Sequence, residues 1–120
     1  REPSVIAEYR FRVREIREAG RYSVTDGAPN TYHEHFRSQD LSVGTYCIPV
    51  GGKDDQLPHS EDEIYVVVSG RGSLVADSGE VEVGPGSVVF VPALEHHRFT
   101  EITEDLTVLV MFAPPERVRS

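Results

Sequence analysis

The chain has 120 residues and a formal net charge of -8, with 38% hydrophobic and 27% charged residues. This length and composition fit one globular domain whose core needs no disulfide or structural metal, and the single cysteine, Cys47, excludes an internal disulfide. No segment approaches the roughly 20 apolar residues of a membrane span. The net negative charge argues against nucleic acid as a partner, because binding to phosphates needs a basic surface. With no apolar signal core in residues 1–10, we expect a cytoplasmic protein.

Residues 1–40 are predicted to form an N-terminal arm. Within it, residues 13–19 fit a short helix stopped by Gly20, although apolar and charged residues also alternate from position 9 to 16. Residues 23–31 are rich in turn formers and predict a loop. His33 and His35 resemble a metal motif in isolation, but they precede the first predicted strand, so we expect them at an exposed edge.

From residue 41 onward, short runs rich in valine, isoleucine, tyrosine and phenylalanine alternate with turn signals. No helical segment separates these runs, which favours antiparallel strands in a sandwich or closed barrel. Residues 41–120 are therefore predicted to form the barrel domain. The predicted turns lie at residues 69–72, 77–79 and 84–86. The predicted strands are residues 41–48, 63–68, 73–76, 80–83, 87–91, 97–103 and 106–112.

Two of these runs, residues 64–68 and 106–112, are apolar on both faces. A strand with one face in water should instead alternate apolar and polar residues. Something must therefore cover the outer face, and the arm and a second subunit are the two candidates. We expect a homodimer.

Three residues have the spacing of metal ligands. His59 and Glu63 are four apart, and two residues with this spacing on a strand point their side chains to one face. His97 follows a hydrophobic strand and the corner at Pro92. Its neighbour His96 has the opposite strand parity and is expected to be exposed. Glu61 has the same parity as Glu63 and is the alternative carboxylate ligand.

Together these segments resemble the two motifs of small single-domain cupins of the cupin 2 type. The first motif reads G-x5-H-x-H-x(3 or 4)-E-x6-G, and the second reads G-x5-P-x-G-x2-H-x3-N. The second half of the first motif is matched by His59, Glu63 and Gly70, and the second motif by Gly86, Pro92 and His97. The chain departs from the motifs at Leu57, where the first histidine would stand, at Leu94 and at Glu101.

The resemblance implies an all-β fold, the antiparallel double-stranded β-helix (jelly-roll or cupin barrel), preceded by the N-terminal arm. It also implies one divalent transition metal ion held by His59, Glu63 and His97. Leu57 leaves three protein ligands in place of four, so positions stay open for water or substrate. Two imidazoles and one carboxylate suit Mn or Fe(II), which we favour, and also Zn, Ni or Cu.

Further residues are candidates for the pocket. Gln56 either approaches the position that Leu57 vacates or is a solvated amide, and the aromatic candidates either line the cavity or belong to the plain core. They are Tyr46, Tyr65, Phe90 and Phe99. The resemblance implies a metalloenzyme acting on a small oxygen-bearing substrate, with dioxygenase-like or isomerase-like chemistry. The alternative is a non-catalytic module that binds or senses a small ligand.

Overall fold

The structure, a computed structural model, describes residues 13–54 and 58–117 of the chain. It confirms the all-β prediction, with six antiparallel strands and one short 3-10 helix in this part of the chain. Among the described residues, no helix is long and apolar enough to cross a membrane. The elements are η1 (Arg17–Gly20), β1 (Thr31–Arg37), β2 (Ser42–Ile48), β3 (Asp62–Ala76), β4 (Gly79–Val83), β5 (Val88–Val91) and β6 (His97–Ala113).

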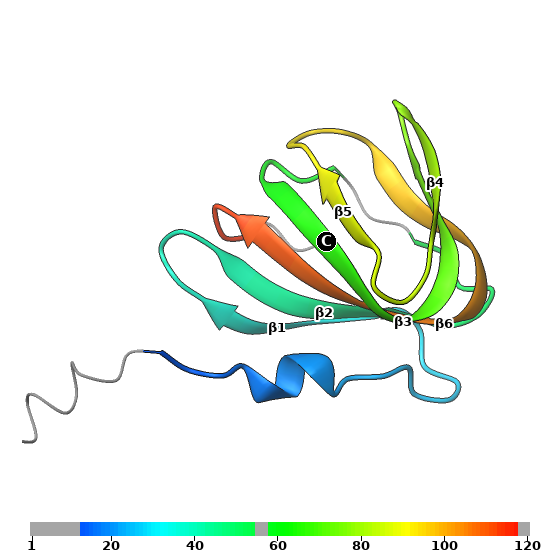
Figure 1. Cartoon of the computed structure of the whole chain (residues 1–120), viewed down its shortest axis with the longest axis horizontal. Coiled ribbons are helices and arrows are strands. Elements are labelled where there is room, and N and C mark those ends of the chain that lie inside the picture. The colour runs from blue at the N-terminus through cyan, green and yellow to red at the C-terminus, as the bar shows by residue number, and fades with distance from the viewer. Residues whose placement is uncertain (1–12, 55–57, 118–120) are drawn as a thin grey trace, which may run out of the picture.

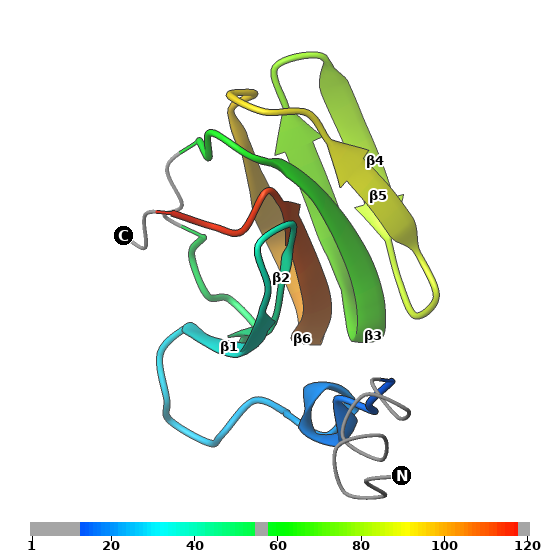
Figure 2. The ribbon, with the colours of Figure 1, turned by 90° about the vertical axis from the view of Figure 1, so that its left-hand side faces the viewer.

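Two long strands, β3 and β6, organise the barrel (Figures 1 and 2). The order of the sheet is β1-β2-β6-β3-β4, and β5 also pairs with β3. The beginning of β3 pairs with β5 and its end pairs with β4, while β6 lies beside β3 over most of the length of both strands. Since β3 and β6 curve through both halves of the barrel, they close it without a separate connecting sheet. This is the predicted double-stranded β-helix.

The turn predicted at residues 69–72 is wrong, because β3 continues through it. The pairing of β3 with β6 shifts register at three places between Val67 and Ser73, so irregular pairing bends the strand where a turn was expected. Gly70 sits in this bend with a φ of +93°, and its backbone lies against the carbonyl of Asp105. The break predicted between residues 103 and 106 is also absent, because β6 continues through the same irregular pairing with β3.

The N-terminal region also differs from the prediction. The helix predicted over residues 13–19 is reduced to the four residues of η1. The strand β1 was not predicted, yet it pairs antiparallel with β2 and carries His33 and His35. It is an edge strand with a register shift between Glu34 and Phe36, which interrupts the regular alternation of side chains that sequence analysis relies on.

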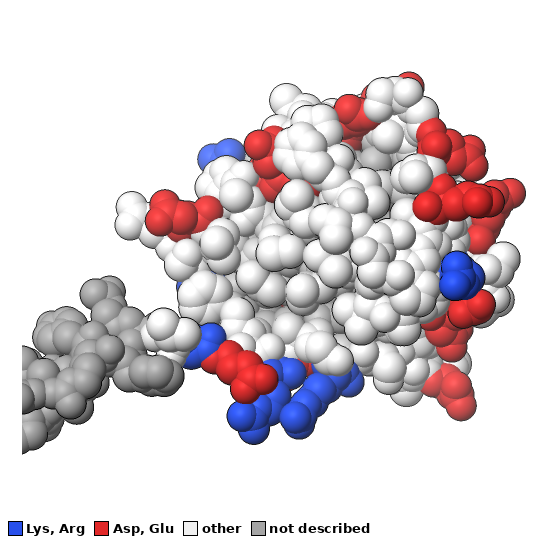
Figure 3. Space-filling model, viewed as in Figure 1, with Lys and Arg blue, Asp and Glu red and all other residues white. Residues whose placement is uncertain are grey.

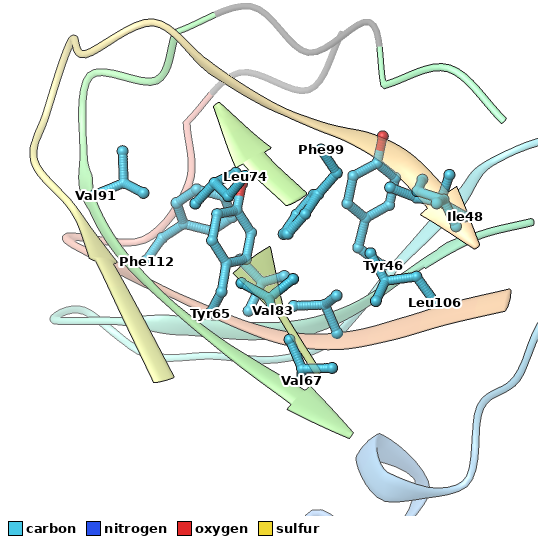
Figure 4. Close-up of a cluster of buried hydrophobic side chains, with 13 residues drawn as sticks. Tyr46, Ile48, Tyr65, Val67, Leu74, Val83, Val91, Phe99, Leu106 and Phe112 are labelled. Carbon is cyan, nitrogen blue, oxygen red and sulfur yellow. The ribbon is translucent and has the colours of Figure 1, made fainter. Parts of the chain in front are cut away.

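Alternating side chains of the strands fill the interior (Figure 4). Tyr65, Phe99 and Phe112 are among the largest fully buried side chains. Cys47 is buried, and burial raises the pKa of its thiol. Phe90 was predicted as a candidate to line the cavity, and this is wrong, because its side chain is 57% exposed. Its neighbour Val91 is buried instead, so β5 turns Phe90 to the outside.

Candidate metal site

Glu63, Tyr65 and His97 form a polar cluster inside the barrel. Glu63 and Tyr65 are two apart on β3 and point to the same face, and His97 is the first residue of β6. The Nε2 atom of His97 lies 2.7 Å from Oε1 of Glu63 and 3.0 Å from the hydroxyl of Tyr65. Figure 4 shows Tyr65 within the apolar cluster. The cluster is therefore shielded from bulk water.

His97 and Glu63 share a proton between the imidazole ring and the carboxylate. The Nδ1 atom of His97 lies 2.8 Å from the backbone oxygen of Glu95, which can only accept, so Nδ1 is the donor. The short contact on the other side of the ring then needs a further proton between Nε2 and the Glu63 carboxylate. Burial alone lowers the pKa of His97, but the hydrogen bonds to Glu63 and Glu95 outweigh burial and leave it raised.

One of the two carboxylate oxygens of Glu63 lacks a hydrogen-bond partner among the described residues. The residue is 2% exposed, and its Oε2 atom has no hydrogen-bond partner among the described residues. A buried carboxylate oxygen without a donor is costly, and buried charges are usually paired or coordinate a metal ion. Oε2 of Glu63 is thus the atom in this cluster with the strongest need for a further cationic partner.

His59 lies on the other side of the cluster. Its ring centroid is 6.3 Å from that of His97 and 4.8 Å from that of Phe112. The Nδ1 atom lies 3.4 Å from Oε2 of Glu116, a buried carboxylate near the end of the described chain. Burial lowers the pKa of His59, so its imidazole is held in the neutral form that binds metals.

The two histidines therefore share one arrangement. Each ring directs Nδ1 at a protein acceptor, Glu116 for His59 and the Glu95 carbonyl for His97. Metal-binding histidines have such a partner on the nitrogen that faces away from the metal, because it fixes the orientation of the ring. The donor types and these outer partners fit a transition metal. Over residues 13–54 and 58–117, however, no three His, Cys, Asp or Glu side chains form a group that could hold a metal ion in their present positions.

The other predicted site residues have different outcomes. Tyr46 and Phe99 belong to the buried core cluster. Gln56 and Leu57 lie outside the described residues. His96 is exposed, as expected from its parity. Glu61 is buried, but its carboxylate is paired with Arg117 at 3.3 Å. This pairing neutralises Glu61 and makes it a weaker candidate ligand than Glu63.

Asp54 and Glu116 are two buried carboxylates that support the site and were not predicted from the sequence. Asp54 accepts a hydrogen bond from the Tyr46 hydroxyl at 2.7 Å and another from the Phe99 amide at 2.8 Å. These bonds attach Asp54 to β2 and β6. Both acids lie outside the strands, where no periodicity marks a buried position, so the sequence carries no signal for them.

A cavity of about 430 Å³ lies beside His97, at the end of β3 and the beginning of β6. Its volume falls within the range typical of small-molecule sites. Polar side chains predominate in its wall, so it suits a ligand with oxygen or nitrogen atoms. The lining residues are Asp54, Val75, Ala76, Asp77, His96, His97 and Arg98.

Comparisons with known proteins agree with this architecture. The family model described as the cupin domain matches residues 44–112. The chain is 46% identical over 106 residues to SCO3923 of Streptomyces coelicolor, described as uncharacterized, covering 88% of this chain and 96% of that protein.

Solved structures share the fold. The crystal structure of TT1209 from Thermus thermophilus superposes with a TM-score of 0.70 at 18% identity, covering 88% of this chain and 99% of that one. A structure from a study of the DMSP lyases RdDddP and RnDddQII superposes with a TM-score of 0.63 at 28% identity. That match covers 68% of this chain and 46% of the other.

Proposed function

Because this chain belongs to the cupin domain family, we propose that it binds one divalent transition metal ion through His59, Glu63 and His97. We further propose that it is a metalloenzyme that acts on a small oxygen-bearing molecule. Mn and Fe(II) are the favoured metals, because two imidazoles and one carboxylate suit both and leave positions open for a ligand. Such a metal, when bound, polarises an oxygen atom of the substrate or activates O2.

The observation that carries this proposal is the shared arrangement of the two imidazoles. His59 and His97 each have Nδ1 directed at a protein acceptor, so Nε2 is the nitrogen that each would offer to a metal. Oε2 of Glu63, buried and without a hydrogen-bond partner among the described residues, supplies the anionic donor. His97 and Glu63 would hold the metal in place of the proton that they share, with His59 as the third ligand.

The remaining residues of the site bind, orient and exclude water. The cavity of about 430 Å³ borders His97 and offers polar side chains to a small molecule. The Tyr65 hydroxyl, 3.0 Å from Nε2 of His97, is placed to donate a hydrogen bond to an oxygen atom of a ligand there. Phe99 and Phe112 exclude bulk water, which strengthens polar contacts inside. One protein of this fold is named as a lyase, so the architecture accommodates an enzyme.

Metal content and activity test the proposal together. We expect protein purified without added metal, or incubated with Mn²⁺, to contain about one equivalent of metal by elemental analysis. We expect a higher melting temperature with Mn²⁺, because a ligand that binds only the folded state stabilises it. The Fe(II) form should consume O2, or convert the substrate, with at least one member of a panel of catechols, β-diketones and thiols.

The outcomes separate the two parts of the proposal. The absence of both bound metal and affinity for added Mn, Fe, Zn, Ni or Cu would rule out the metal site. Bound metal with no turnover across the panel, but tight binding of one compound, would favour a ligand-binding module over an enzyme. His96→Ala is the matched control, because His96 is exposed next to a proposed ligand and should leave the metal content unchanged.

We also propose that the protein acts as a homodimer through the outer face of β3, β5 and β6. Side by side on this face, Phe90, Ile64 and Met111 form one apolar row. Val88, Val66 and Leu109 form the next. Figure 3 shows charged side chains mainly at the rim of the view in which β3 and β5 lie in front. In a chain of net charge -8, an uncharged face allows a second identical copy to approach without like-charge repulsion.

Sedimentation should therefore give a mass of about twice 13.4 kDa. Phe90→Lys should shift the protein to the monomer, because it places a charge in the middle of the apolar face while altering only an exposed side chain. Val50→Lys, an equally exposed apolar position away from this face, should leave the dimer intact. A monomeric wild-type protein at micromolar concentration would refute the interface.

A further inference from the structure

The N-terminal arm, here residues 13–30, lies against the sheet beside β1 and β2 (Figures 1 and 2). Its point of closest attachment is Ala19, which is 6% exposed. The Thr45 hydroxyl of β2 donates a hydrogen bond of 2.9 Å to the backbone oxygen of Ala19. Among the described residues, this is the hydrogen bond that joins residues 13–29 to the sheet. Side-chain contacts with β1 add to it: the Tyr22 ring packs against His33 and His35, and the Arg14 guanidinium lies over the Phe36 ring.

The same hydroxyl contacts His35. The Nε2 atom of His35 lies 2.8 Å from Oγ1 of Thr45. A threonine hydroxyl has one hydrogen, and that hydrogen is used on the Ala19 carbonyl, which can only accept. Nε2 of His35 must therefore donate to Thr45. The neutral ring then carries its proton on Nε2, and Nδ1 holds a lone pair.

The surroundings of Nδ1 disfavour a second proton. Nδ1 of His35 is buried and has no hydrogen-bond partner among the described residues. The His33 ring lies 4.9 Å away between centroids, and the Tyr22 ring of the arm packs against His35 at 4.8 Å. Glu18 of the arm is the acidic group that acts on His35.

The balance of these effects lowers the pKa of His35. Burial contributes most and the neighbouring His33 adds to it, whereas Glu18 opposes both. When the arm leaves the sheet, His35 loses both the burial and the nearby charge of Glu18. Its pKa then returns toward the ordinary value of 6.5.

We propose that the His35–Thr45–Ala19 chain of hydrogen bonds makes the docking of the arm sensitive to pH, so that acidification releases the arm from the sheet. The docked state binds fewer protons than the released state, because it excludes a proton from Nδ1. Docking is therefore fully favoured above the pKa of the released histidine and weakens as the pH falls below it. For one titrating imidazole, the docking equilibrium constant falls by at most about tenfold per pH unit.

NMR spectroscopy on the full chain tests this proposal between pH 7.5 and 5. The signals to follow are the Tyr22 ring and the Ala19 methyl group. Thr45→Val removes the hydroxyl with little change of shape and supplies the spectrum of the released arm. In the wild-type protein, we expect both signals to move toward the Thr45→Val positions as the pH falls, together with the titration of His35.

Variants of His35 and its neighbours make the test specific. His35→Gln keeps an N–H donor for Thr45 but does not titrate, so its arm signals should stay at the docked positions at pH 5. Glu18→Gln removes the opposing charge and should make the release more complete at pH 5. His96→Gln changes an exposed histidine elsewhere and should leave the transition unchanged.

Two results would overturn the proposal. One is a wild-type protein whose Tyr22 and Ala19 signals stay at the docked positions at pH 5. The other is an equal transition in His35→Gln, which would assign the pH dependence to another group. Neither result bears on the metal site, because His35 lies on the outer face of β1 and the proposed ligands lie inside the barrel.

Discussion

Replacing Glu63 with glutamine should lower the affinity for Mn²⁺ by more than about 100-fold while leaving the chain folded. Loss of an outer hydrogen-bond partner of a metal ligand already costs about 10–100-fold in affinity. Removal of the charged donor itself should cost more. Glutamine has the size of glutamate and can still hydrogen-bond to His97, so the buried contact is kept and its charge is removed. Isothermal titration with Mn²⁺ measures the change.

Glu116→Gln gives a graded comparison. Glu116 contacts His59 at 3.4 Å and would not itself touch the metal, so we expect a loss of about 10–100-fold. Circular dichroism at matched concentration checks that both variants are folded. Equal affinity for Mn²⁺ in Glu63→Gln and the wild-type protein would show that Glu63 is not a ligand. A larger loss in Glu116→Gln than in Glu63→Gln would exchange their proposed roles.

Replacing Gly70 with alanine should destabilise the barrel by more than about 3 kcal/mol, a large part of the roughly 5–15 kcal/mol by which a typical domain is stable. An added Cβ would lie 2.1 Å from the Asp105 carbonyl oxygen. The backbone fixes the position of a Cβ, and the oxygen is itself part of the backbone, so no side-chain rotation relieves the clash. The φ of +93° adds strain of about 1–2 kcal/mol for a residue with a side chain. Urea denaturation measures the loss of stability.

Gly86→Ala is the matched control. Gly86 has a similar φ of +89°, but an added Cβ would meet nothing within 4 Å. Its cost should therefore be the strain alone, about 1–2 kcal/mol. If the two variants unfold at the same urea concentration, the close approach of Gly70 to Asp105 does not limit stability, and the bend of β3 is more tolerant than we infer.

The fold was predictable because most strands obey local rules. β2, β4 and β5 begin and end within a residue or two of their predicted bounds, since glycine, proline and aspartate mark the turns between them. The two long strands were each predicted as two short ones. Gly70 and Gly72 give a strong turn signal in sequence, but tertiary pairing with β6 converts that signal into a bend within β3.

Strand periodicity could place only the candidate residues that lie on strands, whereas His59, which precedes β3, was found through the cupin motif alone. Strand parity places Glu63 in the interior, and the interior position of His97 agrees with the resemblance to cupins. Phe90 was misplaced because β5 is only four residues long, so the run of apolar residues does not reveal which face is buried. Asp54 and Glu116 could not be found, since their burial depends on loops that pack back against the barrel.

The curvature of β3 and β6 has a consequence for the site. Along their ladder, Glu63 stands opposite Phe112 near one end, and His97 stands opposite Ala76 at the other. Yet Glu63 and His97 touch at 2.7 Å. The ladder of β3 and β6 therefore curves back until its two ends meet, and the contact between Glu63 and His97 joins those ends. A substitution that opens the bend at Gly70 by a small angle would therefore separate Glu63 from His97, although it changes neither residue.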